Sequence, residues 1–123
     1  AAWQGIGDEA YFGVDGLLGA ASSTAADTLL VACTTATSAG HFVDLTCTND
    51  FLTACTTAPQ FKPRNNTGAT VGTATTCPTA AGQSKTAETL TFAAGDQVCI
   101  VRTTNGGTCT VPSFSVQAHV AYP

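Results

Sequence analysis

The stretch that most constrains the fold is residues 114–122, in which apolar and polar side chains alternate along the C-terminal end of the chain. Successive side chains of a β-strand point to opposite faces, so a period of two indicates a strand with one buried and one solvated face. His119 falls on the solvated face. Two further extended runs, residues 89–93 and 97–102, are separated by Ala94-Gly95-Asp96, a sequence that suits a tight turn. The second half of the chain therefore predicts β structure.

The first half contains further candidate strands of the same kind. Apolar and β-branched residues favour strands at residues 10–14, 28–33, 41–47 and 51–55. Pro63 lacks a backbone N–H and is expected in an edge strand or a loop. With 123 residues, the chain has room for one domain with a real core. We expect an all-β fold, a disulfide-bonded antiparallel sandwich of two sheets.

The N-terminal segment, residues 1–19, is apolar but interrupted by five glycines, which argues against a stable helix. We expect it to be an extended arm preceding a β-sandwich domain at residues 20–123. Two placements are open: the arm folds back as an edge strand of its own sheet, or it lies on a neighbouring subunit by strand addition. Its apolar residues, the candidate assembly contacts, are Trp3, Ile6, Tyr11, Phe12, Val14, Leu17 and Leu18.

Six cysteines, with no Cys-x-x-Cys motif and no Cys/His cluster, predict three disulfides and an oxidising compartment, extracellular or at a cell surface. Cys99 and Cys109 face each other across a hairpin if the loop between them has three residues. A two-residue turn at Asn105-Gly106 excludes that bond. We favour the first geometry, and the pairs expected are Cys99 with Cys109, Cys47 with Cys55, and Cys33 with Cys77.

Charge and motif content argue against several functions. Charged residues make up 10% of the chain and the net charge is -4, which argues against nucleic acid as a partner. No apolar run reaches membrane-spanning length. There is no Gly-x-Ser-x-Gly motif, and His41 and His119 are not spaced for a metal site. We therefore expect no enzyme activity, no metal and no cofactor.

Two features indicate contact with sugars. Asn65-Asn66-Thr67 is an N-glycosylation sequon at Asn65, which predicts a surface loop in a host that glycosylates. Exposed aromatic rings stack on sugars, and a carbohydrate-binding surface is the alternative ligand-binding interpretation. Its candidate residues are Trp3, Tyr11, Phe61 and Tyr122.

Several of these stretches also carry a family resemblance. Residues 61–68, Thr75-Thr76-Cys77, 87–100 and 114–122 resemble the strand and Gly-Asp pattern of TNF/C1q-like jelly rolls of bacterial surface proteins, spore appendages and phage fibre heads. The resemblance covers about half the chain and implies a compact, jelly-roll-like sandwich that trimerises or polymerises, with no catalytic residues to carry over. The six cysteines and the apolar arm depart from that pattern and favour a covalently hardened building block.

These observations together favour a non-enzymatic structural subunit that pairs with copies of itself. The expected assembly is a secreted filament, a pilus-like appendage or a surface layer, held by strand pairing and hardened by disulfides. One alternative is an adhesin-like or fibre-head module that binds surface glycans or a receptor. Another is the globular domain of a type IV pilin, whose composition is similar but which needs a long apolar N-terminal helix that residues 1–19 do not supply.

Overall fold

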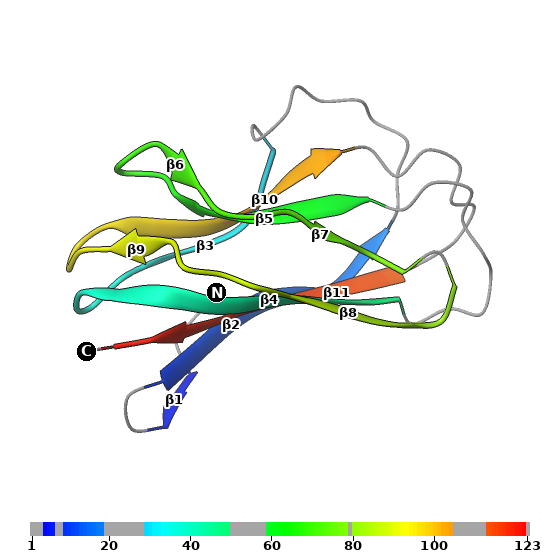
Figure 1. Ribbon diagram of the computed structural model, residues 1–123, viewed down its shortest axis with the longest axis horizontal. Helices are drawn as coiled ribbons and strands as arrows, with labels where there is room; N and C mark the ends of the chain where they lie inside the picture. Colours follow the sequence, from blue (N-terminus) through cyan, green and yellow to red (C-terminus); the bar gives the residue numbers. More distant parts are fainter. Residues whose placement is uncertain are drawn as a thin grey trace.

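Two antiparallel sheets, packed face to face, form the structure, a computed structural model (Figure 1). It describes residues 4–6, 9–18, 29–49, 59–78, 80–104 and 113–122. Sheet A has the strand order β1-β2-β11-β4-β8, and β9 also pairs with β4. Its strands are β1 (Gln4–Ile6), β2 (Glu9–Leu18), β4 (Gly40–Asn49), β8 (Gly82–Ala87), β9 (Thr91–Phe92) and β11 (Ser113–Ala121). Sheet B has the order β3-β10-β5-β6, and β7 also pairs with β5. Its strands are β3 (Leu29–Thr35), β5 (Gln60–Asn65), β6 (Thr70–Val71), β7 (Thr75–Thr76) and β10 (Gln97–Thr104).

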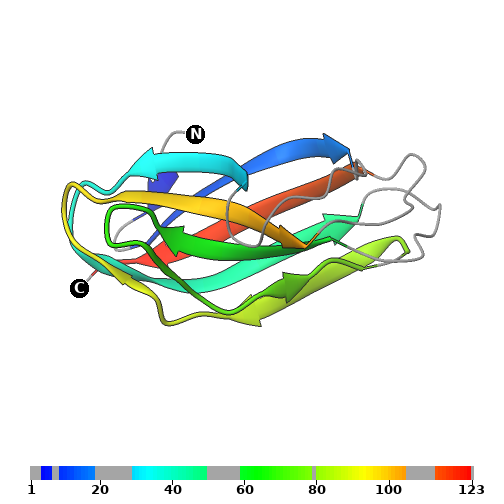
Figure 2. The same cartoon turned by 90° about the horizontal axis from the view of Figure 1, so that it is seen from above.

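The path of the chain between the sheets is that of a jelly roll. The chain passes from β2 in sheet A to β3 in sheet B, returns to β4, and crosses again to β5, β6 and β7. It then enters sheet A at β8 and β9, crosses to β10, and ends in β11 between β2 and β4 (Figure 2). Two interlocked Greek keys of this kind define the double-sheet jelly roll. The prediction of an all-β, two-sheet antiparallel sandwich is therefore confirmed.

The core lies between the sheets and follows the alternation seen in the sequence. Val116, Ala118 and Val120 of β11 are buried, whereas Gln117 between them is exposed. Phe42 is central to the core: its ring packs at 58° to that of Phe12 and at 79° to that of Phe92. Such tilted and edge-to-face contacts add to the stabilisation that comes from area burial alone.

The N-terminal segment is part of the sandwich in this structure. β2 pairs with β11 along its length, from Glu9 opposite Ala121 to Leu18 opposite Ser113. Ala10 and Phe12 belong to the core. In this structure the segment thus folds back into its own sheet, one of the two placements expected for it. The edge strand of the sheet is β1, and β2 lies inside it. Of the proposed arm contacts, Trp3 lies outside the described residues, Ile6 lies on β1, and the others lie on β2.

The predicted disulfide pairing is wrong for the four cysteines that the structure describes. Cys33 bonds to Cys99, and Cys47 bonds to Cys77. The strand that contains Cys99, β10, lies in sheet B, whereas the C-terminal strand β11 lies in sheet A. Cys99 instead lies directly opposite Cys33 on the neighbouring strand β3. Cys55 and Cys109 lie outside the described residues.

Pro63 is also placed differently from the prediction. It lies in β5, which is an interior strand with β10 on one side and β6 and β7 on the other. The carbonyl of Pro63 accepts a hydrogen bond from the N–H of Gly72, in the gap between β6 and β7. In an antiparallel strand, the backbone N–H and C=O of one residue point towards the same neighbouring strand. The position of the N–H that Pro63 lacks therefore faces the gap between β6 and β7, where no regular ladder of hydrogen bonds is broken.

The described part of the chain contains no helix that is long and apolar enough to span a membrane.

Candidate functional site on the outer face of sheet A

β2, β11 and β4 lie side by side in sheet A and present a polar face to solvent. On β11, His119 lies between two buried residues, Ala118 and Val120, so its side chain points away from the core. The prediction that His119 lies on the solvated face is confirmed. The register places it opposite Tyr11 of β2 and Asp44 of β4. Three neighbouring strands therefore bring titratable side chains together.

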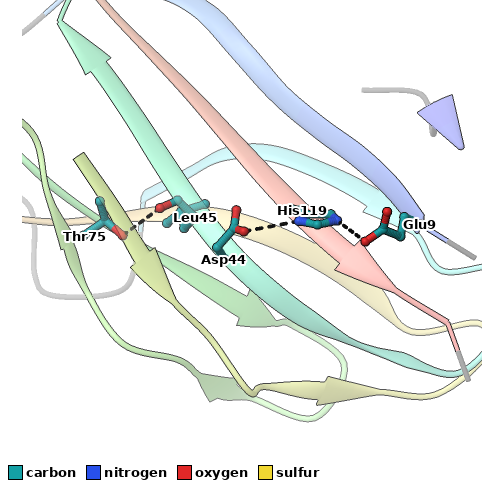
Figure 3. Close-up of polar contacts among 5 residues, drawn as sticks. All are labelled: Glu9, Asp44, Leu45, Thr75 and His119. Carbon is teal, nitrogen blue, oxygen red and sulfur yellow. Dashed lines mark hydrogen bonds and ion pairs between the residues drawn. The ribbon is translucent and has the colours of Figure 1, made fainter. Parts of the chain in front are cut away.

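His119 is held between two carboxylates, one at each ring nitrogen (Figure 3). Nε2 lies 2.9 Å from Oε1 of Glu9, and Nδ1 lies 3.2 Å from Oδ2 of Asp44. The histidine and Asp44 side chains are only 14% and 15% exposed, whereas Glu9 is 53% exposed. We call Glu9, His119 and Asp44 the carboxylate–histidine row.

Tyr11 covers one face of the imidazole. The two ring centroids are 4.5 Å apart and the ring planes differ by 12°, a stacked arrangement. Tyr11 is directly opposite His119 in the ladder, so the contact is a cross-strand pair of the kind that stabilises sheets. The tyrosine ring also limits the orientations available to the imidazole.

The row links three neighbouring strands through side-chain contacts. Glu9 lies on β2, His119 on β11 and Asp44 on β4. Both ring nitrogens of His119 are within hydrogen-bond distance of a carboxylate of the same chain. The row thus connects β2, β11 and β4 on the outer face of sheet A.

The side chains of the carboxylate–histidine row are not arranged as ligands of one metal ion. The two carboxylates contact opposite sides of the imidazole, so they do not converge on one point. Across the residues that the structure describes, no group of three or more His, Cys, Asp and Glu side chains could hold a metal ion. His41 is exposed near the start of β4, opposite Ala121.

Glu88 is a second unusual carboxyl, buried between the two sheets at 5% exposure. Its Oε1 accepts a hydrogen bond of 2.7 Å from the N–H of Thr73 in sheet B, and its Oε2 has no partner. Burial raises the pKa of Glu88; the hydrogen bond from Thr73 opposes this shift and the negative charge of Asp44 adds to it. A Cβ on Gly72 would lie 2.5 Å from Oε1 of Glu88 and 2.6 Å from Cγ of Pro63, so a larger residue here would displace the neighbouring side chains.

Asp96 organises the turn that precedes β10. Its Oδ2 accepts hydrogen bonds from the N–H of Ala93 and from Nδ2 of Asn65, both 2.9 Å long. These bonds lower the pKa of Asp96, the backbone bond contributing most. Gly95 adopts a φ of 88°, which a glycine tolerates and most other residues do not. The predicted turn at residues 94–96 is confirmed.

The same network affects the proposed glycosylation at Asn65. Asn65 is 7% exposed, and its Nδ2 donates to Asp96 and to the carbonyl of Thr91. A glycan is attached to this nitrogen, so its attachment would disrupt both bonds and needs space that the folded chain does not provide. The geometry therefore argues against a glycan at Asn65 in the folded protein.

The candidate sugar-binding aromatics do not form one platform. Phe61 is buried in the core, and Tyr122 packs edge-on against Phe92. Tyr11 lies on the outer face of sheet A beside His119, and Trp3 lies outside the described residues. Among the described candidates, only Tyr11 is therefore placed on the outer face of a sheet.

The carboxylate–histidine row was not foreseen from the sequence. Glu9 and Asp44 precede His119 by 110 and 75 positions. No local spacing relates residues so far apart. A correct strand order, β2-β11-β4, is the signal that brings them together.

Comparisons with known proteins add little. No model of a protein family matches the chain, and no curated protein matches it. Among solved structures, the chain is similar to one described as "Cyanophage Pam1 capsid asymmetric unit", with 16% sequence identity and a TM-score of 0.40. The match covers 100% of this chain and 92% of the other. So loose a superposition does not show a shared function.

Proposed function

We propose that the protein is a non-enzymatic structural subunit that assembles with copies of itself into an extracellular filament, a pilus-like appendage or a surface layer. The contact would be strand pairing, in which the N-terminal strands of one copy complete sheet A of the next. The observation that carries this proposal is the position of β2, which lies between β1 and β11. Removing both N-terminal strands would leave one edge of β11 unpaired.

The bonds that hold β2 are the same whether it comes from its own chain or from a neighbour. The ladder to β11, the burial of Phe12 and the contact from Glu9 to His119 depend only on the register of the two strands. Exchange of an identical element between copies is a low-cost route to oligomers. The segment that joins β2 to β3 would then run between subunits instead of within one.

The remaining character of the chain supports a structural role. Two disulfides brace the sandwich, as is common in proteins of oxidising compartments. The one row of acid–base residues described on the outer face of sheet A is engaged internally. Jelly rolls serve many functions, so the fold alone does not decide between them.

The first test is electron microscopy of the native protein, purified without reductant or denaturant, together with light scattering over a range of concentrations. We expect regular filaments or layers. Monomers at all concentrations would contradict the proposed role.

A second test asks how the subunits are joined. Deletion of residues 1–18 should abolish assembly and lower stability, because Ala10 and Phe12 leave the core. A synthetic peptide of residues 1–18 should bind the truncated protein and restore its melting temperature, whereas the same peptide with Phe12→Asp should not. Filaments that persist after the deletion would rule out exchange of β2 and leave the structural role intact.

Glycan binding is the second candidate, and the stacking of Tyr11 beside two carboxylates favours it. Aromatic faces with neighbouring hydrogen-bond acceptors are typical of sugar-binding sites. We expect such a site to lose glycan retention on an array when Tyr11 is changed to Ala, with the size of the assembly unchanged. Equal retention by the variant and the wild type would exclude this site.

A further inference from the structure

β3 is the outermost described strand of sheet B on the side of β10 (Figure 2). It pairs with β10 on one side, and no described strand pairs with its other side. Its seven residues, LLVACTT, include no charged residue and no proline. Natural sheet edges usually carry such residues because an unpaired edge is a template for another strand. Among the described strands, β3 is therefore a sheet edge that carries neither charge nor proline.

The other described edges are short or carry a charge. In sheet A, β1 has three residues, and β8 at the far edge carries Lys85, which is exposed. In sheet B, β6 and β7 have two residues each. A long and uncharged edge is thus found at β3 and not at these strands.

The surface of β3 that faces away from the core also carries an exposed apolar side chain. Leu30 is 41% exposed. Val31 is an extra residue in the ladder between β3 and β10, that is, a β-bulge. Because of this bulge, Leu30 is opposite Val101, two positions along β10 from Cys99, which is opposite Cys33. The side chains of Leu30 and Cys33 therefore point to the same, outer face. Thr35, two residues beyond Cys33, lies on the same face and is also exposed. Leu30 and Thr35 thus flank Cys33 on the outer face.

A covalent bond holds this edge in place. Cys33 is bonded to Cys99 on β10, with 4.1 Å between the two Cα atoms. An edge strand normally frays and pays conformational entropy when a partner orders it. The bond prevents β3 from separating from β10 at this point, so the edge is ordered before any partner arrives.

We propose that β3 pairs antiparallel with β3 of a second copy, joining the two copies of sheet B into one continuous sheet. This inference rests on the proposed self-assembly and adds a contact separate from the exchange of β2. Each subunit carries a net charge of -4, so most pairs of surfaces on two copies would repel each other. β3 has no charged residue, and two copies of it therefore bring no like charges together when they pair. The contact is isologous, with a two-fold axis near Cys33. It places Leu30 of each subunit towards Thr35 of the partner subunit.

Four double variants test this arrangement, all at exposed positions of β3. Leu30→Lys with Thr35→Lys, and Leu30→Glu with Thr35→Glu, place like charges across the two-fold axis. Leu30→Lys with Thr35→Glu, and Leu30→Glu with Thr35→Lys, place opposite charges there. Within one strand the two positions are about 15 Å apart, so charge pairing inside a subunit is weak. Circular dichroism melts verify that all four variants fold.

We expect the two like-charge variants to dimerise about tenfold or more weakly than the two opposite-charge variants, because each dimer contains two such contacts. Sedimentation equilibrium at low salt measures the difference, and 1 M salt should largely remove it. Four variants that all associate like the wild type would show that β3 is not the contact. Four variants that all dissociate equally would show that β3 meets a different segment. A wild type that stays monomeric would overturn self-assembly itself, which separates that failure from the failure of the β3 contact.

Discussion

At the scale of single residues, the two perturbed carboxyls have opposite effects on stability. Glu88 lies between the sheets with one oxygen unpartnered, and its pKa is raised by burial. Asp96 accepts two hydrogen bonds in a turn, and its pKa is lowered. A raised carboxyl pKa makes the folded state more stable in acid, and a lowered one makes it more stable towards neutral pH.

For Glu88, the stabilisation is fully present below the unfolded pKa, about 4.3, and is lost as the pH rises through the folded pKa. Glu88→Gln keeps the oxygen that accepts from Thr73 and cannot ionise. We expect the variant to be no more stable than the wild type at pH 4 and to gain on it steadily towards pH 7. Urea denaturation across that range measures the difference. Parallel pH profiles for the two proteins would contradict it.

For Asp96, the stabilisation is present above the unfolded pKa, about 3.9, and is lost as the pH falls through the folded pKa. Asp96→Asn removes the charge that the bonds from Ala93 and Asn65 favour. The variant should be less stable than the wild type at pH 7 and should match it near pH 2. Thermal melts at both pH values provide the test, and a deficit that persists in acid would indicate lost packing instead.

At the scale of elements, the carboxylate–histidine row connects three strands of sheet A. His119→Ala removes hydrogen bonds to Glu9 and Asp44 and the stacking contact with Tyr11. We expect a loss of about 1–2 kcal/mol in the free energy of unfolding, modest because Glu9 is half exposed. Gln117→Ala, on the same face of the same strand, is the matched control and should change stability by less than about 0.5 kcal/mol. Equal effects of the two substitutions would show that the row contributes nothing.

The sequence predicts strands where apolar and polar residues alternate. It does not predict which strands lie next to each other in a sheet. The pattern of β11 identified Val116, Ala118 and Val120 as buried, because a period of two is a local signal. The residues on either side of Gly95 were correctly taken as extended, yet β9 pairs in sheet A and β10 in sheet B, so they form no hairpin. The row at His119 and the cysteine pairs depend on strand order. Strand order is set by packing between segments far apart in the sequence and has no local signature.

At the scale of the whole molecule, the two disulfides act on different parts of the sandwich. Cys33–Cys99 joins two adjacent strands of sheet B, and Cys47–Cys77 joins β4 of sheet A to the chain just after β7 of sheet B. Replacing either pair by alanines should cost about 2–4 kcal/mol, because each bond restricts the unfolded chain. Thermal melts of the two double variants measure this cost. An unchanged melting temperature would contradict it for that bond.

Peptide mapping of a non-reduced digest examines the same bonds directly. It should recover Cys33 linked to Cys99 and Cys47 linked to Cys77. Recovery of a Cys99–Cys109 peptide would contradict the pairing in the structure.

The nesting of these bonds has a mechanical consequence. The loop closed by Cys47 and Cys77 lies wholly within the loop closed by Cys33 and Cys99. A force applied to the two ends of the chain passes through the Cys33–Cys99 bond, and residues 34–98 carry none of it. The 123-residue chain would otherwise extend to roughly 430 Å, whereas the bonded chain stops near roughly 200 Å. Such a force would pull out β1, β2 and β11, which lie outside the bond, whereas residues 34–98 would remain a loop closed by Cys33 and Cys99.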